Sequence, residues 1–220
     1  MKKKRILLII VFCLIAIAAT IVLFNFNSKS KNNIEFPISH NEADIIVGEN
    51  SSSNTIFVFF NYNCKYCQRF LNDFKLFSND STLKDLDVKI ILKPLAMSQS
   101  QSEYHALQTL IGLYLYGNPS KVHDLFLHNY NIIYRKEFFG LTDVFINDNP
   151  SFAEFLLNNE DYIYLKTNLL QFNMNKLDVT PTFIINNRKF KGYKNKKSFL
   201  KRLIKELNKN TSYYEQKTNH

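Results

Sequence analysis

The chain of 220 residues contains no tryptophan, only three cysteines, five glycines and five prolines. So few cysteines exclude a small domain held together by several disulfides, and so little glycine and proline excludes a collagen-like or low-complexity chain. A hydrophobic fraction of 45%, with 20 phenylalanines and 12 tyrosines, excludes a disordered chain and is sufficient for a packed core. The composition therefore predicts one globular domain with an attached segment.

The formal net charge of +9 is unevenly distributed. Residues 2–5 are Lys-Lys-Lys-Arg, and residues 188–209 hold ten basic side chains and one acidic one, whereas residues 25–187 are mildly acidic. The second basic segment also carries apolar residues at helical spacing: Phe199, Leu200, Leu203, Ile204 and Leu207. This pattern predicts an amphipathic helix that faces the core with a solvated basic back, with contact to anionic lipid head groups as the alternative. The pattern of a nucleic-acid module is lacking, so no nucleic-acid partner is expected.

The longest apolar run extends from Ile6 to Phe24, directly after the basic residues 2–5, and contains no charged residue. As a helix its nineteen residues would reach across roughly 28 Å, close to the thickness of a bilayer's hydrocarbon core. Residues 1–24 are therefore expected to form a membrane anchor with its basic end in the cytoplasm and the rest of the chain outside. The alternative is a signal peptide cleaved after Ala16-Ile17-Ala18. Cys13, inside this run, is interpreted as an apolar filler.

The remaining chain divides by composition. Residues 25–44 are polar, rich in asparagine and interrupted by Pro37, which predicts a tether. A domain is expected at residues 45–209, followed by a C-terminal tail at 210–220.

Apolar runs within this domain predict strands at 55–60, 88–92 and 182–185, and Asn186-Asn187 is expected to turn the last strand into a hairpin. The unbroken run at 55–60 is typical of a central strand covered on both faces. Residues from about 97 to 176 carry helical stripes and two capping-box sequences, one of them at 100–103. A crossover between parallel strands needs far fewer residues. The domain is therefore predicted to be α/β, with a mixed sheet and an inserted helical subdomain.

Cys64 and Cys67 lie where the strand at 55–60 gives way to an amphipathic helix. Free backbone N–H groups at a helix N-terminus stabilise a thiolate and lower its pKa. Cys64 is therefore expected to be the exposed, reactive sulfur. Cys67 belongs to the apolar stripe, so it is expected to be shielded, to form a disulfide with Cys64 and to resolve mixed disulfides. Lys65 and Tyr66 are expected to tune the pKa, Lys65 as a neighbouring cation.

Two other roles for the cysteine pair fit the sequence less well. A zinc site needs four ligands, but Cys13 lies in the apolar run, and the histidines His105, His123 and His128 lack the paired spacing of a zinc finger. A structural disulfide across so short a loop would constrain the unfolded chain little. We therefore predict a redox-active pair, with no metal and no cofactor beyond the Cys64-Cys67 disulfide.

A second element, Val179-Thr180-Pro181-Thr182-Phe183, places a proline at the mouth of an apolar strand. Such a proline either lies at a sheet edge or follows a cis peptide bond. Together with the cysteine pair, it makes the sequence resemble the bacterial DsbA-like disulfide oxidoreductases of the thioredoxin-like superfamily. The resemblance rests on FFNYNCKYCQRF and VTPTFIINNRKFKGY and covers roughly residues 45–207.

The resemblance implies that Cys64 and Cys67 are the redox pair, that Pro181 is a cis-proline facing them, and that the backbone of Thr180 binds an extended substrate segment. Val58 stands where many relatives have a buried acid, and Val179 replaces the usual glycine. The Lys-Tyr dipeptide between the cysteines differs from the Pro-His of the strongest oxidants. The tyrosine, with the threonine before the proline, is also similar to isomerases of the DsbC and DsbG type.

The implied function is an extracytoplasmic thiol-disulfide oxidoreductase that introduces disulfides into exported proteins. It would act at the bacterial inner membrane as a single-pass protein, or in the periplasm after signal cleavage. The implied partners are reduced or misfolded exported proteins and a DsbB-type membrane quinone reductase. The alternatives are a disulfide isomerase or reductase of the same fold and a non-catalytic, peptide-holding chaperone.

Overall fold

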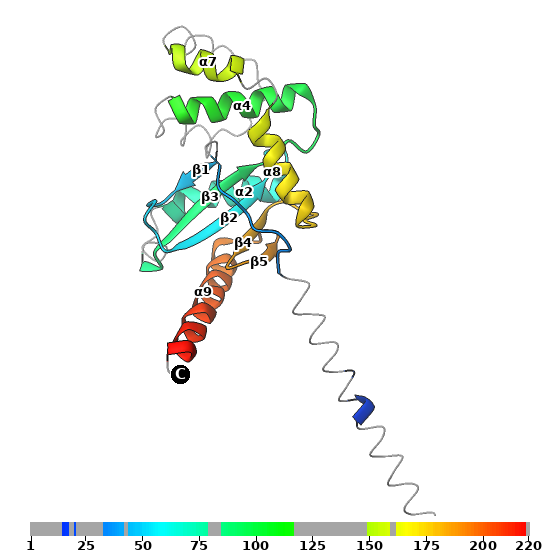
Figure 1. The fold of residues 1–220 in the computed structure, drawn as a ribbon, viewed down its shortest axis with the longest axis vertical. Coiled ribbons are helices and arrows are strands. Elements are labelled where there is room, and N and C mark those ends of the chain that lie inside the picture. The colour runs from blue at the N-terminus through cyan, green and yellow to red at the C-terminus, as the bar shows by residue number, and fades with distance from the viewer. Residues whose placement is uncertain are drawn as a thin grey trace, which may run out of the picture.

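The computed structural model describes residues 15–17, 20, 33–41, 44–78, 85–116, 149–158 and 162–218, without the side chains of 74–78 and 209–218. Its centre is a five-stranded sheet in the order β1-β3-β2-β4-β5 (Figure 1). The strands are β1 (Ile45–Val47), β2 (Asn54–Phe60), β3 (Val88–Pro94), β4 (Thr182–Ile185) and β5 (Arg188–Lys191). β2 pairs parallel with β3, and the other neighbours pair antiparallel. The sheet is therefore mixed, as predicted.

The three predicted strands are confirmed as β2, β3 and β4, and β2 is the central strand. The predicted hairpin is also confirmed, with Asn186 at φ 50° and Asn187 at φ 61° between β4 and β5. Asparagine tolerates this left-handed conformation better than most residues do. The short edge strand β1, antiparallel to β3, was not predicted, because three apolar residues are too few for a periodic signal.

The described helices are α2 (Lys65–Ser78), α4 (Gln101–Tyr116), α7 (Pro150–Asn158), α8 (Ile163–Met174) and α9 (Lys196–Thr218). α4, α7 and α8 all lie between β3 and β4 in the sequence, where the helical insert was predicted. Figure 1 shows α4 and α7 beyond one end of the sheet and α9 extending from the opposite end. α9 continues to Thr218, so most of the predicted tail at 210–220 is helical. Residues 117–148 of the insert, with His123 and His128, lie outside the described residues.

Apolar side chains alternate between the two faces of β2. Val58 and Phe60 belong to a large core cluster that includes Cys67 and residues of α2, α4 and α9. Phe59 faces the other way, into a smaller cluster with Phe172 of α8. Both faces of the central strand are therefore covered, which explains its unbroken apolar sequence.

The segment before β1 requires a correction. Residues 25–44 were predicted to be a tether, but Ile34, Ile38 and Asn41 are partly buried and Asp44 is buried, so part of this segment packs on the domain. Ile34 and Ile38 pack against the cluster around Phe59. The backbone N–H groups of Glu35 and Phe36 both donate to Asn175 Oδ1 at 2.9 Å. Two isolated isoleucines among polar residues do not make a periodic pattern, and for this reason the packing was missed.

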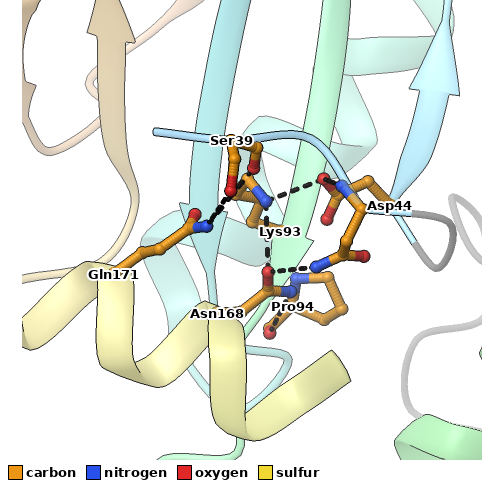
Figure 2. Close-up of polar contacts among 7 residues, drawn as sticks. Ser39, Asp44, Lys93, Pro94, Asn168 and Gln171 are labelled. Atoms are coloured by element: carbon orange, nitrogen blue, oxygen red, sulfur yellow. Dashed lines mark hydrogen bonds and ion pairs between the residues drawn. The ribbon is translucent and has the colours of Figure 1, made fainter. Parts of the chain in front are cut away.

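A buried ion pair fixes the end of this segment (Figure 2). Lys93 Nζ of β3 donates to Asp44 Oδ2 at 2.7 Å, and both side chains are completely buried. Lys93 also donates to Asn168 Oδ1 of α8 at 3.2 Å, and Asn41 Nδ2 donates to the same oxygen. Burial raises the pKa of Asp44 and lowers that of Lys93, so each charge depends on its partner. We call these residues, with Ser39 and Gln171, the Lys93 cluster.

Among the residues that the structure describes, no helix combines the length and apolar composition needed to cross a bilayer. The anchor predicted at 1–24 lies outside the described residues, except for positions 15–17 and 20.

Candidate active site

Cys64 occupies the N-cap position of α2. The backbone N–H of Gln68 donates to the Cys64 carbonyl at 2.9 Å, which is the first hydrogen bond of the helix. A side chain at this position lies next to the N–H groups of the second and third helical residues, Tyr66 and Cys67, which have no partner within the helix. The local sequence therefore delivers Cys64 to the positive end of α2.

These contacts set the acidity of Cys64. Burial opposes the thiolate, but hydrogen bonds from the Thr180 side chain and from the backbone N–H groups of Cys67 and Tyr66 outweigh it. The pKa of Cys64 consequently lies below its ordinary value of 9.0. A lowered pKa increases the thiolate fraction at a given pH and makes the sulfur a better leaving group.

Cys67 lies in a contrasting environment one turn along α2. Its side chain is fully buried in the core cluster that contains Val58 and Phe70. Burial raises the pKa of Cys67 well above its ordinary value, against an opposing hydrogen bond from the Asn61 backbone. Both cysteines are thiols in this structure. The two sulfurs therefore differ in exposure and acidity in the directions that their positions in the sequence predicted.

The residues that lead into β4, Thr180 and Pro181, come next to the active-site helix at Cys64. The peptide bond between Thr180 and Pro181 is cis. Cys64 Sγ donates to the Thr180 carbonyl oxygen at 3.1 Å, which brings together residues 116 positions apart in the sequence. Val179 is 39% exposed, and its carbonyl accepts a hydrogen bond from the Thr182 hydroxyl at 2.6 Å. The structure thus brings Cys64 and Thr180 together.

Lys65 and Tyr66 lie on the exposed side of the first turn of α2. The Lys65 ammonium sits over the Tyr66 ring, 5.2 Å from its centroid. Tyr66, 46% exposed, borders a pocket of about 480 Å³ between the β4–β5 hairpin and α9. The pocket's other aromatic side chains are Phe183, Phe190, Tyr193 and Phe199, and its basic ones are Lys191, Lys194 and Arg202. An apolar concave surface therefore begins beside the cysteine pair.

Two polar residues at the site, Asn61 and Glu103, were not predicted. Asn61 follows β2, and its side-chain N–H donates to Glu103 Oε1 at 3.0 Å and to the Leu95 carbonyl at 2.8 Å. Asn61 Oδ1 accepts the N–H of Asn63 at 2.8 Å. The capping-box sequence at 100–103 was the available signal, but it predicts a bond within α4 and not one to residue 61.

The arrangement has the parts needed for thiol chemistry: a partly exposed sulfur whose pKa is lowered, a buried second thiol and the Thr180 carbonyl beside the first sulfur. His105 is exposed on α4. Within the described residues, no three potential ligands among histidine, cysteine, aspartate and glutamate come together as a metal site.

The comparisons with known proteins agree with this geometry. The family model described as thioredoxin matches residues 40–206. No curated protein sequence matches the chain significantly. Among solved structures, a periplasmic thioredoxin-like protein from Salmonella enterica serovar Typhimurium is 17% identical, with a TM-score of 0.56 over 76% of this chain and 92% of that one.

Two further structures share the fold. The thiol-disulfide exchange protein alpha-DsbA2 of Wolbachia pipientis is 21% identical, with a TM-score of 0.54 over 76% of this chain and 86% of that one. Proteus mirabilis ScsC in a transitional conformation is 18% identical, with a TM-score of 0.55 over 77% and 75%. The family match spans the mixed sheet, the insert and the cysteine pair, so the chain belongs to the thioredoxin family, and the predicted thioredoxin-like fold is confirmed.

Proposed function

We propose that the protein catalyses thiol-disulfide exchange on exported polypeptides and donates the Cys64-Cys67 disulfide to them. The observation that carries this proposal is the asymmetry between the cysteines. Cys64 is accessible with a lowered pKa, whereas Cys67 is buried with a raised pKa. Exchange requires one sulfur that leaves easily and one that is protected from outside attack.

In the proposed reaction, a substrate thiolate attacks Sγ of Cys64 in the oxidised protein. The bond between Cys64 and Cys67 breaks, and Cys67 leaves as a thiolate that takes up a proton, because its pKa is raised. A second substrate thiolate then attacks the substrate sulfur of the mixed disulfide and displaces Cys64 as a thiolate. The substrate loses two electrons and gains a disulfide, while the protein is left with a Cys64 thiolate and a Cys67 thiol.

The substrate segment is proposed to lie along the strand entrance at Thr180. Its backbone would hydrogen-bond to main-chain groups there, a mode that tolerates many sequences. Val179 is exposed beside this edge, and the pocket bordered by Tyr66 is large enough to take apolar side chains of the bound segment. Pro181 would shape this edge opposite Cys64.

The proposed location is outside the cytoplasm, at the bacterial inner membrane through residues 1–24 or in the periplasm after cleavage of that segment. The apolar run at 6–24 with its basic flank supports this proposal. One relative in fold is described as periplasmic and another as a thiol-disulfide exchange protein. A DsbB-type quinone reductase is the proposed partner that returns Cys64 and Cys67 to the disulfide.

Acid trapping of the redox state in cells tests the proposal. An oxidase is expected to be mostly oxidised, and the Cys67→Ala variant is expected to capture clients as mixed disulfides on Cys64. The variant with alanine at both positions 64 and 67 is the control and should capture none. A pair found reduced in cells, with a potential as low as roughly −270 mV, would instead identify a reductase or isomerase. Unimpaired client folding with serine at both positions would identify a peptide-holding chaperone.

A further inference from the structure

Glu103, in the first turn of α4, is an acid buried at the side of the active site that the cysteine chemistry does not use. It is 3% exposed. Its own N–H donates to Ser100 Oγ at 3.2 Å, so one half of the predicted capping box is present. The carboxylate accepts hydrogen bonds from Ser98 N–H at 2.8 Å, from Ser98 Oγ at 2.6 Å and from Asn61 Nδ2 at 3.0 Å. In a complete capping box the Glu103 carboxylate would accept the backbone N–H of Ser100. Here it binds Ser98 and, after the end of β2, Asn61.

A buried carboxylate must be compensated by a cation or by donors. Within the described part of the chain, no lysine or arginine forms an ion pair with Glu103, so the Ser98 and Asn61 donors hold the charge. Asn61 is the donor that comes from outside the insert, 42 positions away in the sequence. A hydrogen bond to an ionised acceptor is stronger than one between neutral groups. Glu103 therefore holds the Asn61 amide in one orientation.

Asn61 is 5% exposed and contacts the surroundings of both cysteines. Its carbonyl accepts the N–H of Cys64 at 3.2 Å, and its Oδ1 accepts the N–H of Asn63 at 2.8 Å. A hydrogen bond from the Asn61 backbone also reaches the Cys67 sulfur. The orientation of Asn61 thus fixes residues 61–64, which we call the active-site loop.

We propose that Glu103 is a positioning residue for the Cys64-Cys67 pair, acting through Asn61 to hold the active-site loop where the Tyr66 and Cys67 N–H groups reach the Cys64 sulfur. The helical insert, which carries Glu103, is in this way coupled to the reactive thiol. The inference deepens the proposed function, since it concerns the same pair of cysteines.

The proposal is testable because the two ways in which Glu103 could act change the pKa of Cys64 in opposite directions when Glu103 is removed. If Glu103 positions the loop, its loss weakens the hydrogen bonds to the Cys64 thiolate and raises the pKa of Cys64. If Glu103 acts only by its negative charge, its loss removes a repulsion and lowers that pKa. The rate at which iodoacetamide alkylates Cys64 at pH 7 reports the thiolate fraction, and its pH profile reports the pKa.

The experiment measures alkylation of Cys64 in the reduced full chain for Glu103→Ala, Glu103→Gln, Asn61→Ala and the Asn61→Ala/Glu103→Ala double variant. Glu103→Ala and Asn61→Ala are each expected to slow the reaction at pH 7 at least threefold. The double variant should match Asn61→Ala alone, because Glu103 acts through that residue. Glu103→Gln keeps an oxygen that accepts from Asn61 and should restore most of the rate.

The matched control is Gln108→Ala. Gln108 is a polar residue of α4 that is as buried as Glu103, and it donates to the Leu156 carbonyl at 3.3 Å, away from the loop. The Gln108→Ala substitution should lower the stability of the protein without changing the pH profile of Cys64 alkylation. If Glu103→Ala does not fold, Glu103→Leu fills the same space without accepting a hydrogen bond. Should neither fold, Asn61→Ala alone must raise the pKa of Cys64 for the proposal to stand.

Several results would overturn the proposal. Faster alkylation in both Glu103 variants would show that the charge acts directly. Additive effects in the double variant would show that Glu103 and Asn61 act independently. Lower stability with an unchanged pH profile would leave Glu103 a purely structural role. None of these readouts uses a client, so failure to capture mixed disulfides with Cys67→Ala would contradict the proposed function alone.

Discussion

The Lys93 cluster and the Cys64 site both hold a charged group in the domain, but they do so in different ways. Lys93 is fully buried and faces the carboxylate of Asp44 at 2.7 Å. Cys64 is partly exposed, and the groups that most favour its thiolate are neutral donors: the Thr180 side chain and two backbone N–H groups. Complete burial closes the first site to other molecules, and the opposite charge of Asp44 compensates Lys93 there, whereas partial exposure leaves the Cys64 sulfur able to react. The Lys93 charge therefore serves the structure, whereas the Cys64 thiolate serves the reaction.

The strongest test of this comparison is Lys93→Ala. Removal of the ammonium leaves Asp44 buried without its partner, so the free energy of unfolding is expected to fall by about 3–5 kcal/mol. The pH profile of Cys64 alkylation should not change, because the two sites use different groups. Urea denaturation measures the first effect and alkylation the second.

The control for Lys93→Ala replaces both charges, as Asp44→Leu with Lys93→Met. Two apolar side chains of similar volume need no partner, so this variant should be within about 1 kcal/mol of the wild type, or more stable. A double variant as unstable as Lys93→Ala would mean that the cluster contributes through its other hydrogen bonds and not through the ion pair.

The second prediction concerns the two thiols of the reduced protein. At pH 7, iodoacetamide should alkylate Cys64 at least about 100-fold faster than Cys67, because Cys64 is accessible with a lowered pKa and Cys67 is buried with a raised one. Mass spectrometry of single-cysteine variants gives each rate. Comparable rates would show that the neutral donors do not separate the two sulfurs.

The cysteine pair could be located from the sequence because its determinants are local. A strand, a turn and an apolar helical stripe lie within residues 55–77, and their order places Cys64 at a helix N-terminus. The contact between Cys64 and Thr180 follows from the fold, and the sequence did not predict it. The resemblance to DsbA-like proteins implied only that Pro181 faces the pair and that the Thr180 backbone binds substrate.

The buried polar contacts could not be predicted, because they join residues that are distant in the sequence. Asp44 and Lys93 are 49 positions apart, and each looks like an ordinary surface residue in its own segment. Glu103 had a sufficient local explanation as the last residue of a capping box. Nothing local indicates that its carboxylate reaches Asn61, since that contact depends on how the insert packs against the sheet.

The third prediction follows from the acidity of the two thiols. The pKa of Cys64 is lower in the folded than in the unfolded chain, so the unfolded state binds more protons between that lowered value and about 9.0. Over this window the reduced protein should gain stability with rising pH, by up to about 1.4 kcal/mol per pH unit. Above pH 9 the trend should reverse, because the unfolded chain ionises Cys67 and the folded one does not.

Denaturation of the reduced and oxidised forms at several pH values isolates this contribution. The oxidised form has neither thiol, so the difference between the two curves contains only terms that depend on the thiols. A difference independent of pH between 6 and 9 would contradict the lowered pKa of Cys64.

The smallest expected effect is that of Lys65→Met. This substitution tests how much a nearby cation stabilises the Cys64 thiolate compared with the neutral hydrogen-bond donors. Lys65 is adjacent to Cys64 in the sequence, but its ammonium lies over the Tyr66 ring and is exposed to solvent. Screening by water makes such a charge worth well under 1 kcal/mol to a neighbour, so alkylation of Cys64 at pH 7 should slow by less than about twofold. Methionine keeps the length of the side chain, and Lys166→Met on α8 controls for the change in net charge. A much larger decrease, abolished by 1 M salt, would mean that Cys64 depends on an opposite charge after all, as Lys93 does.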